Sequence, residues 1–276
     1  MSPIISAAQL INSQNSGQPL VIVDCRASLT DIGAGLRRYH EGHIRGAVYA
    51  SIDQDLSGEI TSSTGRHPLP PLEEFVAFLR EIGVCNDSTM VVYDDMGGAM
   101  AARLWWMMTA LGHTRIQVLD GGLQSYEAMG GEITAGQERN PPGDFDADGV
   151  WSVVTTHQIA TDPQLSVVDA RAEERFSGEV EPIDGKAGHI PGAYNLPFGG
   201  NLDAHGRFKS PEEIRLRFEA QGLNPNKRHT AMCGSGITAC HLLLARAVAG
   251  LTPWDLYAGS WSEWISDPTR PVETGP

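Results

Sequence analysis

Short apolar runs alternate with longer amphipathic stretches along the whole chain. The runs at 21–23, 89–93 and 116–119 are rich in β-branched and other apolar residues and are bounded by turn residues, a pattern typical of buried parallel strands. The stretches at 72–82 and 99–111 place apolar residues at helical spacing. This alternation predicts an α/β fold in which a parallel sheet carries helices on both of its faces.

The second half of the chain shows the same pattern of strands and helices. Strands are expected at 167–169 and 230–232, and helices at 211–221 and 237–249. In a parallel sheet of this kind, ligands collect beyond the carboxyl ends of the strands. Asp94 in the first half and Cys233 in the second half directly follow corresponding strands. We therefore expect them at equivalent positions of two similar sheets.

An internal sequence repeat relates the two halves. The sequence VIVDCR at 21–26 returns as SVVDAR at 166–171, and GHIRGA at 42–47 returns as GHIPGA at 188–193. The copies are offset by 145 and 146 residues, and further matches follow in the same order. Because motifs that recur in a constant order mark a repeated structural unit, the chain is interpreted as a tandem duplication.

The duplication predicts two domains joined by a linker. A chain of 276 residues has room for two domains of ordinary size. Residues 136–150 are rich in glycine, proline and acidic residues and lack a regular apolar pattern, which is typical of a linker. We expect a first domain at 1–135 and a second domain at 151–276.

Charge and cysteine content exclude several classes of function. Thirty-four acidic against 20 basic residues give a net charge of −14, which repels nucleic acid and anionic membranes. The start of the chain lacks the basic residues and long apolar run of a signal peptide, so we expect a cytoplasmic protein. The four cysteines include no Cys-x-x-Cys pair and predict neither a disulfide framework nor a zinc site. We expect no metal and no cofactor.

The sequence CGSGIT lies between a predicted strand and a predicted helix. Its glycines allow successive backbone N–H groups to turn toward the cysteine sulfur, and the helix N-terminus adds partial positive charge. This setting favours a thiolate and also suits a persulfide, whose outer sulfur carries negative charge. The predicted nucleophile loop consists of Cys233, Gly234, Ser235, Gly236, Ile237 and Thr238.

Both halves of the chain resemble the two-domain rhodanese superfamily of sulfurtransferases. The resemblance rests on the Asp-x-Arg motifs at Asp24 and Asp169, the Gly-His-Ile motifs at Gly42 and Gly188, and the loop at Cys233. It implies two tandem rhodanese-like domains, of which the first lacks the nucleophile and the second carries it as a cysteine persulfide. The implied acceptors are cyanide or a thiol such as thioredoxin or glutathione.

The loop sequence predicts the sulfur donor. Members of the family that act on thiosulfate typically carry Cys-Arg-Lys-Gly, whereas Cys-Gly-Ser-Gly resembles the 3-mercaptopyruvate sulfurtransferases. A neutral loop also fits a donor whose single carboxylate lies several atoms from its sulfur, because a thiosulfate dianion gains more from cations beside the cysteine. We therefore expect transfer from 3-mercaptopyruvate with release of pyruvate, assisted by the hydroxyl of Ser235. A thiosulfate:cyanide sulfurtransferase is the alternative.

The resemblance also implies the residues that bind the donor. The arginine that precedes Phe176 corresponds to the family's anion-binding arginine and is Arg175. A second arginine is usual a few residues later, where this chain has Ile183. Lys186 is the candidate substitute, although an ammonium lacks the bidentate geometry of a guanidinium.

The first half of the sequence offers candidates for a proton relay, and two other functions remain to be weighed. Asp31 and His43 form a candidate relay toward the cysteine, with a structural role for His43 as the alternative and His67 as a weaker candidate. A phosphatase needs arginine six residues after its cysteine, where this chain has Ala239. A non-catalytic sulfur carrier or interaction module is the second alternative.

Overall fold

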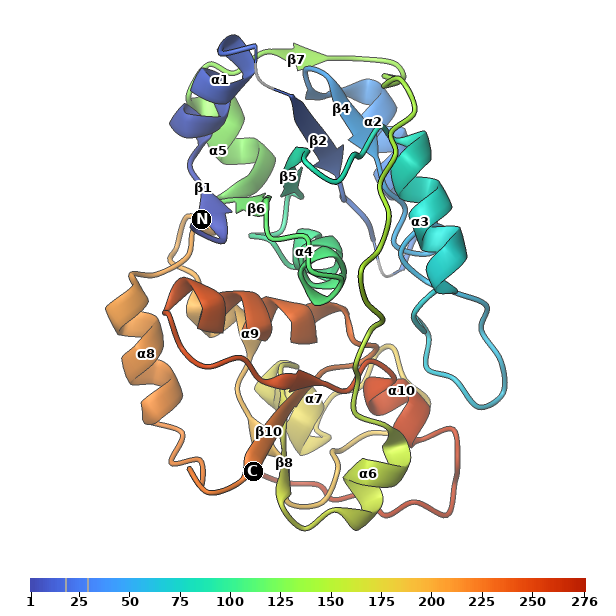
Figure 1. Cartoon of the computed structure of the whole chain (residues 1–276). Coiled ribbons are helices and arrows are strands. Elements are labelled where there is room, and N and C mark those ends of the chain that lie inside the picture. Colours follow the sequence, from blue (N-terminus) through green and yellow to red (C-terminus); the bar gives the residue numbers. More distant parts are fainter. Residues whose placement is uncertain (18, 29) are drawn as a thin grey trace. The chain divides into compact units, whose positions relative to one another are not determined.

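The computed structural model describes residues 1–17, 19–28 and 30–276, and these form two compact units (Figure 1). Unit 1 consists of Met1–Gly58, Leu69–Trp151 and Asp203–Phe208. Unit 2 consists of Glu59–Pro68, Ser152–Leu202 and Lys209–Pro276. Each unit therefore includes one short segment from the other half of the sequence.

Unit 1 is built on a five-stranded parallel sheet in the order β1-β6-β5-β2-β4. A short antiparallel pair, β3 with β7, lies outside this sheet. The central strands are apolar along their length because the sheet is covered on both faces. The strands are β1 (Ile4–Ile5), β2 (Leu20–Asp24), β3 (His43–Ile44), β4 (Ala47–Tyr49), β5 (Thr89–Tyr93), β6 (Ile116–Leu119) and β7 (Ile133–Thr134).

The helices of unit 1 cover its sheet. Helix α1 begins at a capping box formed by Ser6 and Gln9 and lies against α5, and α4 packs on β5 and β6 (Figure 1). Almost every residue of α4 is buried, in keeping with a sequence that is apolar apart from Arg103 and Thr109. The helices are α1 (Ala7–Asn15), α2 (Ala34–Glu41), α3 (Leu72–Glu81), α4 (Ala101–Ala110) and α5 (Gly122–Ala128).

Unit 2 contains a four-stranded parallel sheet in the order β11-β10-β8-β9. The apolar helix α9 packs on β10, and α8 begins at a capping box formed by Ser210 and Glu213 (Figure 1). The strands are β8 (Leu165–Asp169), β9 (Tyr194–Asn195), β10 (Arg228–Met232) and β11 (Asp255–Leu256). The helices are α6 (Thr156–Thr161), α7 (Glu173–Ser177), α8 (Pro211–Glu219), α9 (Ile237–Val248), α10 (Ser260–Trp264) and the 3₁₀ helix η1 (Phe198–Asn201).

The predicted α/β architecture with parallel sheets is confirmed in both units. The segment expected as a linker, 136–150, packs along unit 1. Phe145 is buried there, its N–H donates to the Val84 carbonyl at 3.0 Å, and its carbonyl accepts from Arg80 Nε at 2.8 Å. In the part of the chain that the structure describes, no helix is both long and apolar enough to cross a membrane.

Candidate active site

The site of unit 2 begins where β10 ends. Cys233 follows this strand directly, and α9 begins four residues later. Gly236 adopts φ +80°, and a Cβ at this position would lie 2.3 Å from the Ala258 carbonyl oxygen, so glycine is required there. This turn points the Gly236 N–H at Cys233 Sγ, 3.1 Å away. The predicted strand, loop and helix thus place a backbone donor on a buried cysteine sulfur.

The segment around Ser260 fixes the backbone of the nucleophile loop. Ser260 Oγ accepts from the Cys233 N–H at 3.1 Å, while the N–H groups of Trp261 and Ser262 donate to the carbonyls of Cys233 and Gly234. Among the described residues, Ser260 is the one non-glycine residue with a positive φ, at 56°. A left-handed non-glycine residue is strained, and such strain is commonly held at functional sites. Here it allows one side chain to anchor the cysteine.

The hydroxyl of Ser235 contacts a histidine from a distant part of the sequence. His67 Nδ1 lies 2.7 Å from Ser235 Oγ, and both residues are buried. His67 reaches this position because Glu59–Pro68 belongs to unit 2. The Arg66 N–H donates to Ser262 Oγ at 3.0 Å, and a Cβ on Gly65 would lie 2.4 Å from the Gly259 carbonyl oxygen. The chain therefore lies against the 259–262 turn.

The predicted relay residues make contacts of their own within unit 1. His43 is buried in β3, with Nδ1 2.8 Å from the Tyr39 carbonyl oxygen and Nε2 3.1 Å from Thr134 Oγ1. Asp31 is exposed and pairs with Arg37 at 2.6 Å. Both ring nitrogens of His43 are thus engaged in holding unit 1 together. The histidine that contacts the loop hydroxyl is the one that the sequence ranked as weaker, His67.

Two arginines flank the nucleophile loop. A Cβ added to Gly234 would lie 3.0 Å from Arg66 Nη2 and 3.5 Å from Arg175 Nη2. Arg175 pairs with Glu181 at 2.8 Å and with Asp184 at 2.9 Å, and Arg66 Nε pairs with the other oxygen of Asp184 at 3.0 Å. The loop itself is neutral, as its sequence shows, but its surroundings carry two guanidinium groups.

Glu181 holds the arginine side of the site in place. Burial tends to raise the pKa of its carboxyl, but hydrogen bonds from Arg175 and from the N–H groups of Asp184 and Ile183 outweigh this and lower the pKa. The buried carboxylate also lies 3.4 Å from Arg171. Glu181 is therefore an ionised anchor for Arg175.

The Asp-x-Arg motifs have the same structural role in each unit. Arg171 bonds the Asp169 carboxylate at 2.6 Å and the Gly188 carbonyl at 2.8 Å, and Arg26 likewise bonds Asp24 and the Gly42 carbonyl, each at 2.6 Å. The contacts tie the end of a strand to the Gly-His-Ile motif.

The remaining predicted residues lie at varied positions around the loop. Lys186 has an exposed side chain, and its carbonyl accepts from Trp261 Nε1 at 2.9 Å. Ile237 is buried and Thr238 is half-buried in the first turn of α9. Cys240 is buried one turn further along, with Sγ 3.3 Å from the Gly236 carbonyl oxygen. The structure brings Cys233, Ser235 and Arg175 together, whereas a donor-binding role of Lys186 stays a prediction.

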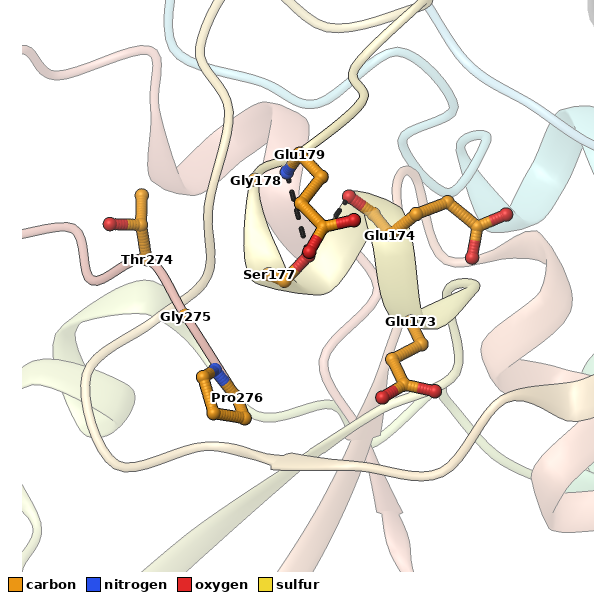
Figure 2. A pocket seen from close by; sticks show the side chains of 8 residues that line it. All are labelled: Glu173, Glu174, Ser177, Gly178, Glu179, Thr274, Gly275 and Pro276. Carbon is orange, nitrogen blue, oxygen red and sulfur yellow. Dashed lines mark hydrogen bonds between the residues drawn. The ribbon is translucent and has the colours of Figure 1, made fainter.

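An acidic hollow in unit 2 offers different chemistry. It has a volume of about 690 Å³, lies beside α7 and is lined by Glu173, Glu174 and Glu179 together with the 274–276 segment (Figure 2). Ser177 Oγ donates to the Glu174 carbonyl and accepts from the Glu179 N–H. Carboxylates repel an anionic sulfur donor, so this hollow does not replace the site around Cys233.

Known proteins match this chain over nearly its full length. The model of the rhodanese-like domain matches residues 6–129 and 153–267. A probable 3-mercaptopyruvate sulfurtransferase from Pseudomonas aeruginosa is 46% identical over 98% of this chain and 100% of its own length. A putative thiosulfate sulfurtransferase from Mycobacterium tuberculosis is 39% identical over 99% of this chain and 97% of its own length.

The solved structures give the same result for the fold. The 3-mercaptopyruvate sulfurtransferase from Leishmania major superimposes with a TM-score of 0.84 at 32% identity. The superposition covers 96% of this chain and 75% of the other. The match includes both units, so the tandem repeat seen in the sequence corresponds to a known two-domain architecture.

Proposed function

The chain belongs to the rhodanese-like family, and we propose that it is a sulfurtransferase that moves a sulfane sulfur from 3-mercaptopyruvate, through a persulfide on Cys233, to an acceptor. The observation that carries this proposal is the loop after β10, where a backbone N–H points at the cysteine sulfur and two guanidinium groups flank the loop. The backbone N–H suits a sulfur nucleophile, and the guanidinium groups suit an anionic donor.

In the first half-reaction, the Cys233 thiolate attacks the sulfur of 3-mercaptopyruvate. A sulfur–sulfur bond forms and the carbon–sulfur bond breaks, and its electron pair leaves with the pyruvate enolate. The enolate carbon then takes up a proton, in balance with the proton lost from the donor thiol, to give pyruvate. The Gly236 N–H, 3.1 Å from Cys233 Sγ, is placed to stabilise negative charge on sulfur throughout.

In the second half-reaction, the acceptor takes the outer sulfur. Cyanide or a thiolate forms a bond to this sulfur, the sulfur–sulfur bond breaks, and its electrons return to Cys233 as a thiolate. The products are thiocyanate or a new persulfide. We propose thiol acceptors such as thioredoxin or glutathione. The cytoplasm, where such thiols are kept reduced, fits the four free cysteines of the chain.

Ser235 and His67 supply the proton path of the first half-reaction. Their 2.7 Å contact lets the imidazole receive the proton that Ser235 takes from the donor thiol and return it to the enolate. We propose His67 for this role in place of His43, because both nitrogens of His43 already contact groups of unit 1. Arg175 contributes the charge that binds the donor carboxylate.

Thiosulfate is the second candidate donor, and one observation favours it. The guanidinium groups of Arg66 and Arg175 lie beside Gly234 although the loop itself is neutral, and a dianion can accept hydrogen bonds from both. The loop sequence alone therefore does not decide between the donors. A non-catalytic sulfur carrier would use the same cysteine without turnover.

The deciding experiment is a pair of steady-state assays on the full-length protein with 3-mercaptopyruvate and with thiosulfate, each with cyanide as acceptor. We expect kcat/KM for 3-mercaptopyruvate to exceed that for thiosulfate by at least tenfold, which corresponds to about 1.4 kcal/mol of differential transition-state binding. A preference for thiosulfate identifies the second candidate. Absence of turnover with either donor contradicts both.

A further inference from the structure

We propose that Arg66, from the short segment that the first half of the chain contributes to unit 2, is the second cation of the donor-carboxylate site. This inference rests on the proposed function and adds a specificity-determining residue to it. Arg66 precedes His67, and a Cβ on Gly234 would lie 3.0 Å from its Nη2, closer than the 3.5 Å from Arg175 Nη2. The position after Glu181-Pro182 is Ile183, whose side chain carries no charge.

The charge balance of the site depends on Arg66. Within unit 2, three guanidinium groups and three carboxylates form one connected cluster of hydrogen bonds and ion pairs. These residues are Arg66, Arg171, Arg175, Asp169, Glu181 and Asp184. With Arg66 the charges of the cluster cancel, whereas without it the cluster carries a net charge of −1. A negative cluster beside Cys233 would repel an anionic donor.

The three arginines differ in the donors that they still offer. Arg171 is almost fully buried, and its Nε, Nη1 and Nη2 all bond protein oxygens. Arg66 and Arg175 keep 28% and 16% of their side chains exposed. Within the described parts of the chain, their hydrogen bonds use Nε and Nη2 and leave both Nη1 groups unengaged. Arg171 is therefore structural, and the other two arginines offer N–H groups to a ligand.

Asp184 sets the spacing of these two arginines. Its buried carboxylate bonds Arg175 Nη2 at 2.9 Å through Oδ2 and Arg66 Nε at 3.0 Å through Oδ1. One carboxylate thus holds two guanidinium groups side by side at the nucleophile loop. A carboxylate of the donor can bond one N–H of each, which fixes its distance from the reacting sulfur. Asp184 is a positioning residue in this arrangement.

The experiment compares Arg66→Gln and Arg66→Lys with a matched control, Arg228→Gln. Arg228 is an exposed arginine of unit 2 that pairs with Asp162 at 2.9 Å and takes no part in the cluster. We expect Arg66→Gln to raise KM for 3-mercaptopyruvate by 10- to 100-fold with kcat changed less than threefold, because a charge-assisted hydrogen bond to the donor is lost. Arg66→Lys should give an intermediate KM, and the control should match wild type.

Two further readouts separate binding from structure. Pyruvate has the carboxylate of the donor but no reactive sulfur. Its inhibition constant should therefore rise from wild type to Arg66→Lys to Arg66→Gln, as KM does. The rate at which cyanide discharges a preformed persulfide should stay unchanged. A KM within threefold of wild type in both variants, an unchanged pyruvate constant, or equal losses in both half-reactions overturns the role of Arg66. Failure of the proposed function is distinct, because wild type itself would then not turn over 3-mercaptopyruvate.

Discussion

The loops after β5 in unit 1 and after β10 in unit 2 have the same place in the fold but hold different groups. In unit 1, four backbone N–H groups, from Met96, Gly98, Met100 and Ala101, donate to the carboxylate of Asp94 at 2.7–2.9 Å. In unit 2, the Gly236 N–H points at the sulfur of Cys233. One loop therefore encloses a carboxylate of the chain itself, whereas the other holds the cysteine that we propose as the nucleophile.

Two repeated histidines, His43 and His189, have the same structural role in both units. His43 and His189 occupy the repeated Gly-His-Ile motifs, and each has Nδ1 2.8 Å from a backbone carbonyl oxygen. Each ring also stacks on an aromatic side chain, at 4.1 Å on Tyr39 and 3.7 Å on Phe176. The repeated residues thus build the scaffold, whereas the residues proposed for the chemistry differ in identity from those at corresponding positions of the other half.

The largest expected effect is that of Cys233→Ser. A hydroxyl does not carry a sulfane sulfur, so transfer from 3-mercaptopyruvate should fall by about 10⁴-fold or more. Circular dichroism and the unfolding midpoint should stay near wild type, because serine keeps the small volume at this position. Asp94→Cys, the matched change in unit 1, should not restore transfer. Activity that survives Cys233→Ser contradicts the comparison of the two loops.

The two histidines provide the next test. His67→Asn should lower kcat of the donor half-reaction by about 10²-fold, the lower end of what general acid–base catalysis contributes. His43→Asn should leave kcat near wild type and reduce the free energy of unfolding, because its hydrogen bonds hold β3 in unit 1. Stopped-flow measurement of pyruvate release and urea unfolding of both variants check this. A loss of kcat in His43→Asn but not in His67→Asn would instead identify His43 as the relay histidine.

Asp94→Asn should act on stability. The amide would turn an N–H donor toward backbone N–H groups that now bond a carboxylate, at a cost of about 2–3 kcal/mol in the free energy of unfolding. The midpoint of urea denaturation measures this, with the exposed Asp31→Asn as control. A loss below about 0.5 kcal/mol would mean that the loop of unit 1 does not depend on its internal anion.

The smallest expected effect is the contribution of Glu181 to the pH dependence of stability. Its pKa is lowered in the folded chain, so its ionised form contributes stability above the ordinary glutamate value of about 4.3. That contribution is lost as pH falls through the lower pKa of the folded state. Wild type should therefore lose more stability than Glu181→Gln between pH 6 and pH 3, measured by urea unfolding. Parallel pH curves would contradict the anchoring role of Glu181.

The sequence predicted the repeat, the parallel sheets and the loop residues because each leaves a local signal. Strands and helices follow from apolar spacing, and Cys233 and Ser235 follow from a glycine-rich turn between strand and helix. Arg175 came from the family motif before Phe176.

His67 and Arg66 were harder to predict because they lie in the first half of the sequence but belong to unit 2. No repeat or periodic pattern marks such an exchange of segments. The available signal was an Arg-His pair in a loop otherwise rich in glycine, serine, threonine and proline. For the same reason, the sequence did not reveal that Arg66 lies beside the nucleophile loop together with the predicted Arg175.

The most direct test of the central claim is to measure the masses of the cysteine-containing peptides after the protein has reacted with the donor. Wild type is incubated with 3-mercaptopyruvate without acceptor, digested without reductant and analysed by mass spectrometry. We predict that one sulfur atom is added to the peptide containing Cys233 and that cyanide removes it. Sulfur found instead on a peptide containing Cys25 or Cys85 in unit 1, or localised to Cys240, would contradict the account.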